Sequence, residues 1–207
     1  MRNEKLEYSI QRMPHVECGM AVGLFGGSFN PPHEGHLELA KTALSKLKLD
    51  QLWWMISPKN PFKEKKNLAS LSERVFLSQK IVNDPRICIT TFEAFLRRPY
   101  TLDSLLHIKS RYTSVNFIWL MGADNLKEFH YWYKWKKIVM TIPIAIIDRP
   151  SILLNHMSLP LAKAFDYARI DESFSCSLSR KKAPVWSFIH KQHLSISSTY
   201  LRKKETL

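Results

Sequence analysis

Short apolar runs alternate with helical patterns along most of the chain, and this alternation constrains the fold more than any other feature of the sequence. The first run, MAVGLF at residues 20–25, ends at a glycine pair, as expected of a buried parallel strand. Residues 35–49 follow with apolar side chains at helical spacing. Strands and helices that alternate at this spacing form crossover units, so we predict an α/β domain with a doubly wound parallel sheet.

The same alternation continues to the end of the chain. Residues 1–18 are polar and lack periodicity, so we expect an N-terminal extension outside the fold, with 19–207 forming a single domain. Either Ser70 or Ser72 can cap the helix that follows them. The segment 150–184 carries no clear pattern. Further strands are predicted at 51–57, 86–93, 115–122, 142–148 and 185–190, and further helices at 71–82, 101–112, 123–129, 133–141 and 197–207.

The formal net charge of the 207-residue chain is +13, which favours anionic partners such as nucleotides, nucleic acid or acidic lipid. Many basic residues lie in local clusters such as KEKK and KWKK, which we interpret mostly as solvated surface. The sequence has no basic stretch interleaved with aromatic residues of the kind that marks nucleic-acid modules. We therefore expect no nucleic-acid partner.

The apolar runs are too short to span a bilayer, and residues 1–20 are too charged for a signal peptide. Cys18, Cys88 and Cys176 form an odd, widely spaced set, which argues against a disulfide framework and against a zinc site. These features predict a cytoplasmic protein with reduced thiols and no membrane partner.

The loop after the first strand, GGSFNPPHEGH at residues 26–36, occupies the usual phosphate site of such sheets. Its glycine spacing matches neither the dinucleotide fingerprint nor a Walker loop. A helix start disfavours a protonated histidine unless an anion binds beside it, so His33 and His36 could hold a triphosphate and stabilise a leaving pyrophosphate. The alternative is that His33 caps the helix and His36 faces solvent.

This loop resembles the G-G-[ST]-F-[DN]-P-x-H-x-G-H motif of the nucleotidyltransferase superfamily that carries the H-x-G-H signature. ISSTYLR at 196–202 is similar to that superfamily's second motif. Two middle segments, RRPYTLDSL at 97–105 and MGADNLKEFHYWYKW at 121–135, resemble bacterial nicotinate-nucleotide adenylyltransferases. The resemblance covers roughly residues 20–204, with asparagine at position 30 and serine at position 28 as mild departures from the commoner residues.

The resemblance implies a Rossmann-like nucleotidyltransferase fold and an enzyme of NAD biosynthesis. Members of the family transfer AMP from ATP to nicotinate mononucleotide, giving nicotinate adenine dinucleotide and pyrophosphate. They use Mg²⁺, which we expect to arrive with ATP because the sequence has no cluster of carboxylates spaced to hold it. The oligomeric state stays open.

The resemblance also assigns residues to roles. His33, His36 and Arg202 are the expected catalytic residues. Asp124 is expected to accept hydrogen bonds from a ribose hydroxyl. The expected ATP-binding residues are Gly26, Gly27, Ser28, Phe29, His33, His36, Asp124, Ser198, Thr199 and Arg202, and the expected nicotinate mononucleotide-binding residues are Lys63, Thr101, Trp132, Tyr133 and Arg149. Trp135 is expected to pack in the core rather than bind a ligand.

Two alternatives remain. The first is an adenylyltransferase of the same superfamily that acts on nicotinamide mononucleotide or on phosphopantetheine. The second, from another class, is a non-catalytic RNA-binding protein that uses the +13 charge, but it leaves both phosphate motifs without a role.

Overall fold

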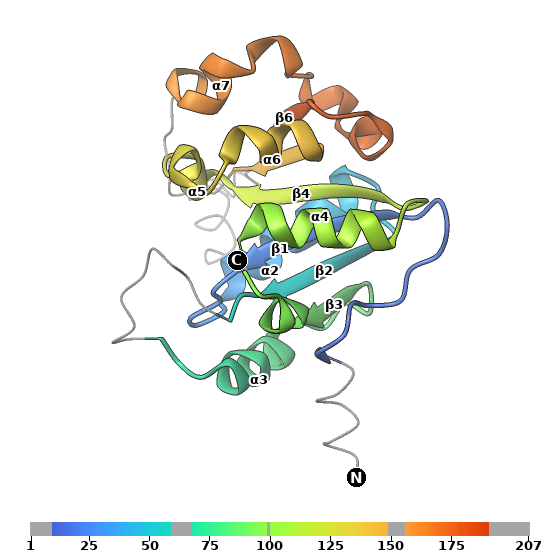
Figure 1. Ribbon diagram of the computed structural model, residues 1–207, viewed down its shortest axis with the longest axis vertical. Coiled ribbons are helices and arrows are strands. Elements are labelled where there is room, and N and C mark those ends of the chain that lie inside the picture. The colour runs from blue at the N-terminus through green and yellow to red at the C-terminus, as the bar shows by residue number, and fades with distance from the viewer. Residues whose placement is uncertain (1–9, 59–67, 99, 149–155, 191–207) are drawn as a thin grey trace, which may run out of the picture.

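The centre of the molecule is a parallel sheet with the strand order β3-β2-β1-β4-β5-β6 (Figure 1). The computed structural model describes residues 10–58, 68–98, 100–148 and 156–190. The strands in these ranges are β1 (Ala21–Gly27), β2 (Gln51–Ile56), β3 (Ile87–Thr90), β4 (Asn116–Gly122), β5 (Ile144–Ile147) and β6 (Trp186–Ile189). The order reverses between β1 and β4, which confirms the predicted doubly wound sheet.

Side chains of the central strands alternate between two buried faces, as the pleat of a strand requires. Trp53 and Met55 of β2 join the core on one face, whereas Leu52 and Trp54 join the core on the other. Burial on both faces explains why β2 reads as a continuous apolar run, QLWWMI, with little polar alternation. The alternation predicted from sequence therefore corresponds to one sheet with two cores.

Each face of the sheet has its own helices. The helices α4 (Thr101–Arg111) and α6 (Trp135–Thr141) bury apolar side chains in the core that contains Trp53. The helices α2 (Glu34–Lys46) and α3 (Leu71–Ile81) pack in the core that contains Trp54. In Figure 1, α4 lies in front of the sheet and α2 lies behind it. Of the two candidate caps for α3, Ser70 is the one used, since its side chain accepts from the Glu73 amide at 3.2 Å.

Part of the N-terminal segment packs on the fold, whereas all of residues 1–18 were expected outside it. The amide of Thr91 donates to the Ile10 carbonyl at 2.8 Å, and the Thr90 hydroxyl donates to the Arg12 carbonyl at 2.7 Å. Val16 is buried, with Met13 packed beside it. The physical reason is that apolar side chains at three-residue spacing cover the core next to the end of the edge strand β3.

The segment between β5 and β6, which showed no clear sequence pattern, consists of short helical turns where it is described. These turns are η4 (His156–Ser158), α7 (Pro160–Ala164), η5 (Asp166–Ala168) and η6 (Glu172–Arg180). Leu161 and Phe165 pack in one core and Leu178 packs in the other. The turns η4, α7 and η5 span too few residues for a periodic pattern to show, and the nine-residue η6 is a 3₁₀ helix, whose period of three residues differs from that of an α-helix.

The remaining short helices come after β3 and β4 in the chain. They are η2 (Phe92–Phe95), α5 (Ala123–Leu126) and η3 (Phe129–Tyr131). The helix predicted at 197–207 lies outside the described residues. No helix in the described part of the chain combines the length and apolarity needed to cross a membrane.

Candidate active site

The expected ATP loop follows the carboxyl end of β1, and Asp124 follows the carboxyl end of the neighbouring strand β4. β1 and β4 pair in parallel with Phe25 opposite Leu120, so the residues that follow each strand emerge side by side. Asp124 is half-buried at the start of α5, directly after β4. Because the strand order reverses between β1 and β4, this is the switch point at which open α/β sheets bind ligands.

Gly26 is required by packing as well as by the approach of a ligand. A Cβ atom at this position would lie 2.5 Å from Cη2 of Trp119, so any side chain would displace a buried indole. Gly35, in the H-E-G-H stretch, has the His33 ring 3.2 Å from the place of its missing Cβ atom. Two of the glycines of this loop therefore give room to aromatic side chains.

Phe29 holds the loop in an uncommon backbone conformation. Its φ of 45° lies in the left-handed region, which non-glycine residues rarely adopt. The whole residue is 2% exposed, and its ring stacks on Trp54 with the ring centroids 4.3 Å apart. Packing of this ring therefore fixes the loop between β1 and α2.

His33 and His36 lie together at the start of α2. His33 is the N-cap residue of the helix, and its amide donates to Nδ1 of His36 at 3.3 Å. The ring centroids are 3.7 Å apart. His33 is thus the cap, as the alternative interpretation expected, but His36 turns back toward it and meets the Phe29 ring at 5.1 Å. Because Nδ1 of His36 accepts, a neutral His36 carries its proton on Nε2, where it can donate to an anion.

Thr101 and Tyr133 come from different segments and are brought together by a tyrosine stack. Tyr100 precedes α4 and stacks on Tyr133 with the ring centroids 4.7 Å apart. Thr101 is the first residue of α4 and is half-buried. The next residue after Tyr133, Lys134, has a left-handed φ of 51° and places Nζ 4.8 Å from the Tyr133 ring centroid.

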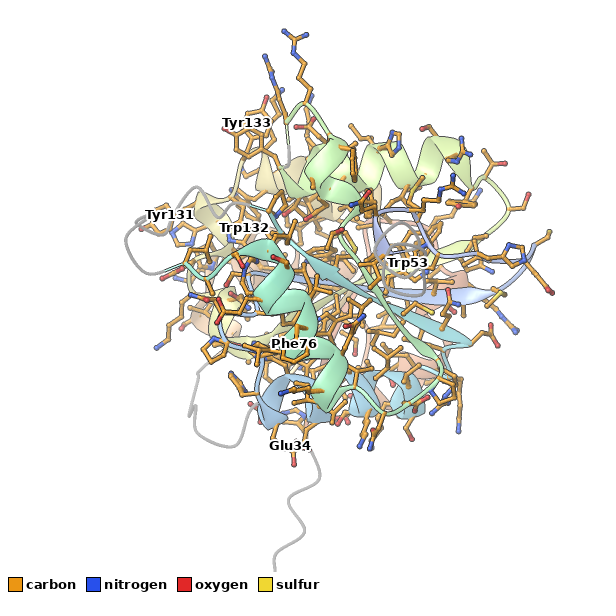
Figure 2. All side chains as sticks on the ribbon, turned by 90° about the horizontal axis from the view of Figure 1, so that it is seen from below. Glu34, Trp53, Phe76, Tyr131, Trp132 and Tyr133 are labelled. Carbon is orange, nitrogen blue, oxygen red and sulfur yellow. The ribbon has the colours of Figure 1, made fainter. Side chains whose placement is uncertain are left out.

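Trp132 packs beside the loop of β1 and remains partly exposed. Its ring meets Phe129 at 5.4 Å and Trp119 at 6.2 Å, and Trp119 is the indole that lies against Gly26. Trp132 lies with Tyr131 and Tyr133 on the left of Figure 2, the side toward which the strands point in Figure 1. Trp135 packs against Phe129 and the core, which confirms the expectation for that residue.

Five expected site residues lie outside the described residues: Lys63, Arg149, Ser198, Thr199 and Arg202. The described part of the site therefore contains the glycine loop, the histidine pair, Asp124 and the segment around Thr101 and Tyr133.

Two buried charged residues near the site were not anticipated from the sequence. Arg74 is 1% exposed and donates to the carbonyls of Ser28 at 2.7 Å, Ser57 at 2.8 Å and Ala69 at 3.1 Å. Burial lowers the pKa of its guanidinium from the ordinary value. The spacing of Leu71, Arg74, Val75 and Ser78 along one face of the helix is the sequence signal that could have indicated a buried arginine.

Glu93 is the second such residue and is 4% exposed. Its carboxyl group accepts from the hydroxyls of Ser57 at 2.9 Å and Ser104 at 2.7 Å. Burial raises the pKa of Glu93, and the two hydrogen bonds oppose this only in part. No spacing in its short 3₁₀ turn distinguishes it from an exposed glutamate.

Comparisons with known proteins agree with this arrangement. Residues 24–204 match the family model described as cytidylyltransferase-like. The chain is 53% identical over 191 residues to a probable nicotinate-nucleotide adenylyltransferase of Mesorhizobium japonicum, covering 92% of this chain and 98% of that protein. It is 52% identical over 187 residues to a probable nicotinate-nucleotide adenylyltransferase of Rhizobium meliloti, covering 90% and 100%.

A solved structure shares the fold. Plasmodium falciparum nicotinic acid mononucleotide adenylyltransferase complexed with NaAD matches with a TM-score of 0.64 and 20% identity, over 89% of this chain and 83% of that one. The match to the family model includes residues 26–36, residues 196–202 and the segment between them. The chain therefore belongs to the cytidylyltransferase-like family and, within it, to the nicotinate-nucleotide adenylyltransferases.

Proposed function

We propose that this protein transfers AMP from ATP to nicotinate mononucleotide, forming nicotinate adenine dinucleotide and pyrophosphate in NAD biosynthesis. The observation that carries the proposal is the histidine pair, whose rings lie 3.7 Å apart at the start of α2 beside the glycine loop. The names of the relatives point to the same substrates.

The reaction needs positioning and charge stabilisation more than a protein nucleophile. A phosphate oxygen of the mononucleotide attacks the α-phosphorus of ATP, and the bond from that phosphorus to the bridging oxygen of pyrophosphate breaks. Negative charge then grows on the leaving pyrophosphate. His33, His36 and the first N–H groups of α2 would donate to this charge, and because they are held at the helix start they would need little reorganisation as it grows.

The remaining ATP contacts follow the family resemblance. The backbone of Gly26, Gly27, Ser28 and Phe29 lies against the nucleotide, and Asp124 accepts from a ribose hydroxyl. Ser198, Thr199 and Arg202 complete the triphosphate site, with Arg202 stabilising the charge on the reacting phosphates.

The mononucleotide lies on the other side of the switch point, between the start of α4 and the segment after η3. The Thr101 hydroxyl and the Tyr133 backbone N–H hold the nicotinate carboxylate, and Trp132 stacks on the pyridine ring. Lys63 and Arg149 bind the phosphate. The nicotinate carboxylate accepts hydrogen bonds from both the Thr101 hydroxyl and the Tyr133 N–H. The NH₂ group of nicotinamide is itself a donor, so one of these two protein donors would have no acceptor.

Mg²⁺ enters with ATP. In residues 10–58, 68–98, 100–148 and 156–190, no three His, Cys, Asp or Glu side chains come together in a way that could hold a metal ion. Magnesium commonly binds through substrate phosphates with few protein ligands, which fits a site built of histidines and backbone donors. Bound in this way, the ion would neutralise part of the phosphate charge.

We also propose a cytoplasmic location. Cys18, Cys88 and Cys176 are free thiols, as expected in a reducing compartment, and burial raises the pKa of the Cys88 thiol.

The test is to identify the product. The protein is incubated with ATP, Mg²⁺ and one acceptor at a time: nicotinate mononucleotide, nicotinamide mononucleotide or phosphopantetheine. We expect nicotinate adenine dinucleotide, with one pyrophosphate released per dinucleotide formed. A product from phosphopantetheine alone, or no product with any acceptor, would contradict the proposal.

A further inference from the structure

A series of buried and half-buried polar groups connects the loop of β1 with the start of α4. Arg74 binds the carbonyls of Ser28 and Ser57 through the same Nη1 atom. The side chain of Ser57 then donates to Glu93, and Glu93 accepts in turn from Ser104. The series thus begins in the expected ATP loop and ends in the first turn of the helix that begins with Thr101.

Glu93 is the member of this series that touches α4. Each of its carboxyl oxygens has its own hydroxyl donor: Oε2 accepts from Ser57, just after β2, and Oε1 accepts from Ser104. A buried carboxyl group costs free energy unless its hydrogen bonds are made. Its two bonds hold three segments together, namely the end of β2, the turn η2 and the first turn of α4.

The first turn of α4 carries the groups expected to recognise the mononucleotide. The amide of Ser104 donates to the Tyr100 carbonyl at 3.0 Å, so Ser104 lies directly over the residue that stacks on Tyr133. The other end of α4 is held separately, by Nζ of Lys109, which donates to the Thr141 carbonyl at 2.6 Å. A change at Glu93 therefore acts on the beginning of the helix and not on its end.

We propose that Glu93 is a positioning residue, which fixes the first turn of α4 so that Thr101 and the segment around Tyr133 fit the nicotinate mononucleotide. This inference rests on the proposed function. Glu93 acts through Ser104 and touches no substrate. Its effect should be larger at α4, because Glu93 accepts directly from Ser104 of that helix, whereas it reaches the expected ATP loop only through Ser57, whose amide donates to the Gly27 carbonyl at 2.9 Å.

Three variants test the proposal by steady-state kinetics. Glu93→Leu removes both hydrogen bonds, and Ser104→Ala removes one with a smaller risk to folding. We expect each to raise the KM for nicotinate mononucleotide, by about tenfold or more for Glu93→Leu, with the KM for ATP within about twofold of the wild type. Glu93→Gln keeps an acceptor for one serine hydroxyl and offers a donor to the other. Its KM for nicotinate mononucleotide should therefore stay near that of the wild type.

Ser110→Ala is the matched control. Ser110 lies in the same helix, is exposed, and its hydroxyl donates to the His107 carbonyl at 2.9 Å within the helix. This variant should leave both KM values unchanged. If Glu93 only stabilised the fold, Glu93→Leu and Ser104→Ala would lower the amount of active enzyme and leave both KM values unaltered, and that result would overturn the proposal.

Hydrogen exchange in the protein without substrates separates this proposal from the proposed function. Ser104→Ala and Glu93→Leu should speed exchange of the backbone amide at position 104 by about tenfold or more. The Tyr112 amide donates to the Ile108 carbonyl at the other end of α4, and its exchange rate should stay as in the wild type. Equal exchange of Ser104 in variant and wild type overturns the positioning role. If the wild-type protein forms no dinucleotide, the proposed function is wrong. The exchange measurement still decides whether Glu93 fixes the first turn of α4.

Discussion

The imidazole of His36 turns back over the helix start and lies 3.7 Å, centroid to centroid, from the imidazole of His33. Two positive charges at this distance repel each other, and Nδ1 of His36 already accepts from the His33 amide, so His36 is suited to donate from Nε2 as a neutral ring. The pair is therefore suited to bind one polyphosphate group jointly. Glu34, at the first position of α2, lies at the lower edge of Figure 2 and points away from the rest of the molecule.

Replacement of His36 tests the role of this pair in catalysis. His36→Ala should reduce turnover by roughly a hundred- to a thousandfold, because it removes a preorganised donor to charge that develops in the transition state. Binding of ATP should weaken much less, since His33 and the helix N–H groups remain. The measurement is single-turnover AMP transfer beside calorimetric ATP binding. His107→Ala, an exposed histidine on α4, should change neither quantity, and normal turnover in His36→Ala would contradict the assignment.

Arg74 should be a major contributor to stability. Arg74→Leu leaves the carbonyls of Ser28, Ser57 and Ala69 without their charged donor, at a cost of about 1–3 kcal/mol for each unsatisfied buried group. We expect the free energy of unfolding in urea to fall by about 3 kcal/mol or more. Arg74→Lys should recover only part of this loss, because a single ammonium cannot span carbonyls on three segments.

Arg86→Leu is the matched control for Arg74. Arg86 is paired with Asp84 at 2.8 Å, but its side chain is half-exposed, so this variant should change the unfolding free energy little. A loss in Arg74→Leu no larger than the loss in Arg86→Leu would contradict the structural account of Arg74.

The burial of Glu93 should make the free energy of unfolding depend on pH. Because the pKa of Glu93 is raised in the folded protein, the folded state holds this proton more tightly than the unfolded state does. Protonated Glu93 therefore contributes its full stabilisation at pH values below the ordinary pKa of glutamate, about 4.3. This stabilisation is lost as the pH rises through the raised pKa of the folded protein. Glu93→Gln, which does not titrate, should gain stability relative to the wild type over this range, by up to about 1.4 kcal/mol per pH unit.

Urea unfolding of the wild type and Glu93→Gln at a series of pH values measures this difference. A difference in unfolding free energy that is constant with pH, or that favours the wild type as the pH rises, would show that the pKa of Glu93 is not raised.

Thr101 tests the recognition of the nicotinate carboxylate. Thr101→Val keeps the shape of the side chain and removes its hydroxyl, so kcat/KM for nicotinate mononucleotide should fall about tenfold or more. The KM for ATP should stay within about twofold. Thr113→Val, at an exposed threonine after α4, is the control and should behave as the wild type. Equal losses for ATP and mononucleotide in Thr101→Val would argue against a specific contact.

The sheet was predictable because its signals are local and repeated. QLWWMI is apolar at every position but the first, and a helical pattern lies before and after it. Such a run is typical of a buried parallel strand. The loop from Gly26 to His36 was equally visible, since its residues lie next to each other in sequence. The structure adds what sequence order cannot give, such as the indole of Trp119 against Gly26.

Other features depend on contacts between segments far apart in the chain. Arg74 has the helical spacing of a buried position, but its charge favours exposure, and its burial depends on carbonyls supplied by residues 28, 57 and 69. Glu93 likewise depends on Ser104, eleven residues later, for one of its two donors. The packing of residues 10–16 depends on Thr90 and Thr91 at the end of β3 and on the core that contains Trp53, which distant parts of the chain supply.

The most direct test of the function is to compare nicotinate and nicotinamide mononucleotides as acceptors with saturating ATP and Mg²⁺, measuring kcat/KM for each by pyrophosphate release. The donor pocket around Thr101 and Tyr133 predicts a preference for the acid of about a hundredfold or more, because the amide leaves buried groups unpaired. Equal or better use of nicotinamide mononucleotide would contradict the assignment of nicotinate as the substrate, and the absence of a dinucleotide with either acceptor would contradict the account as a whole.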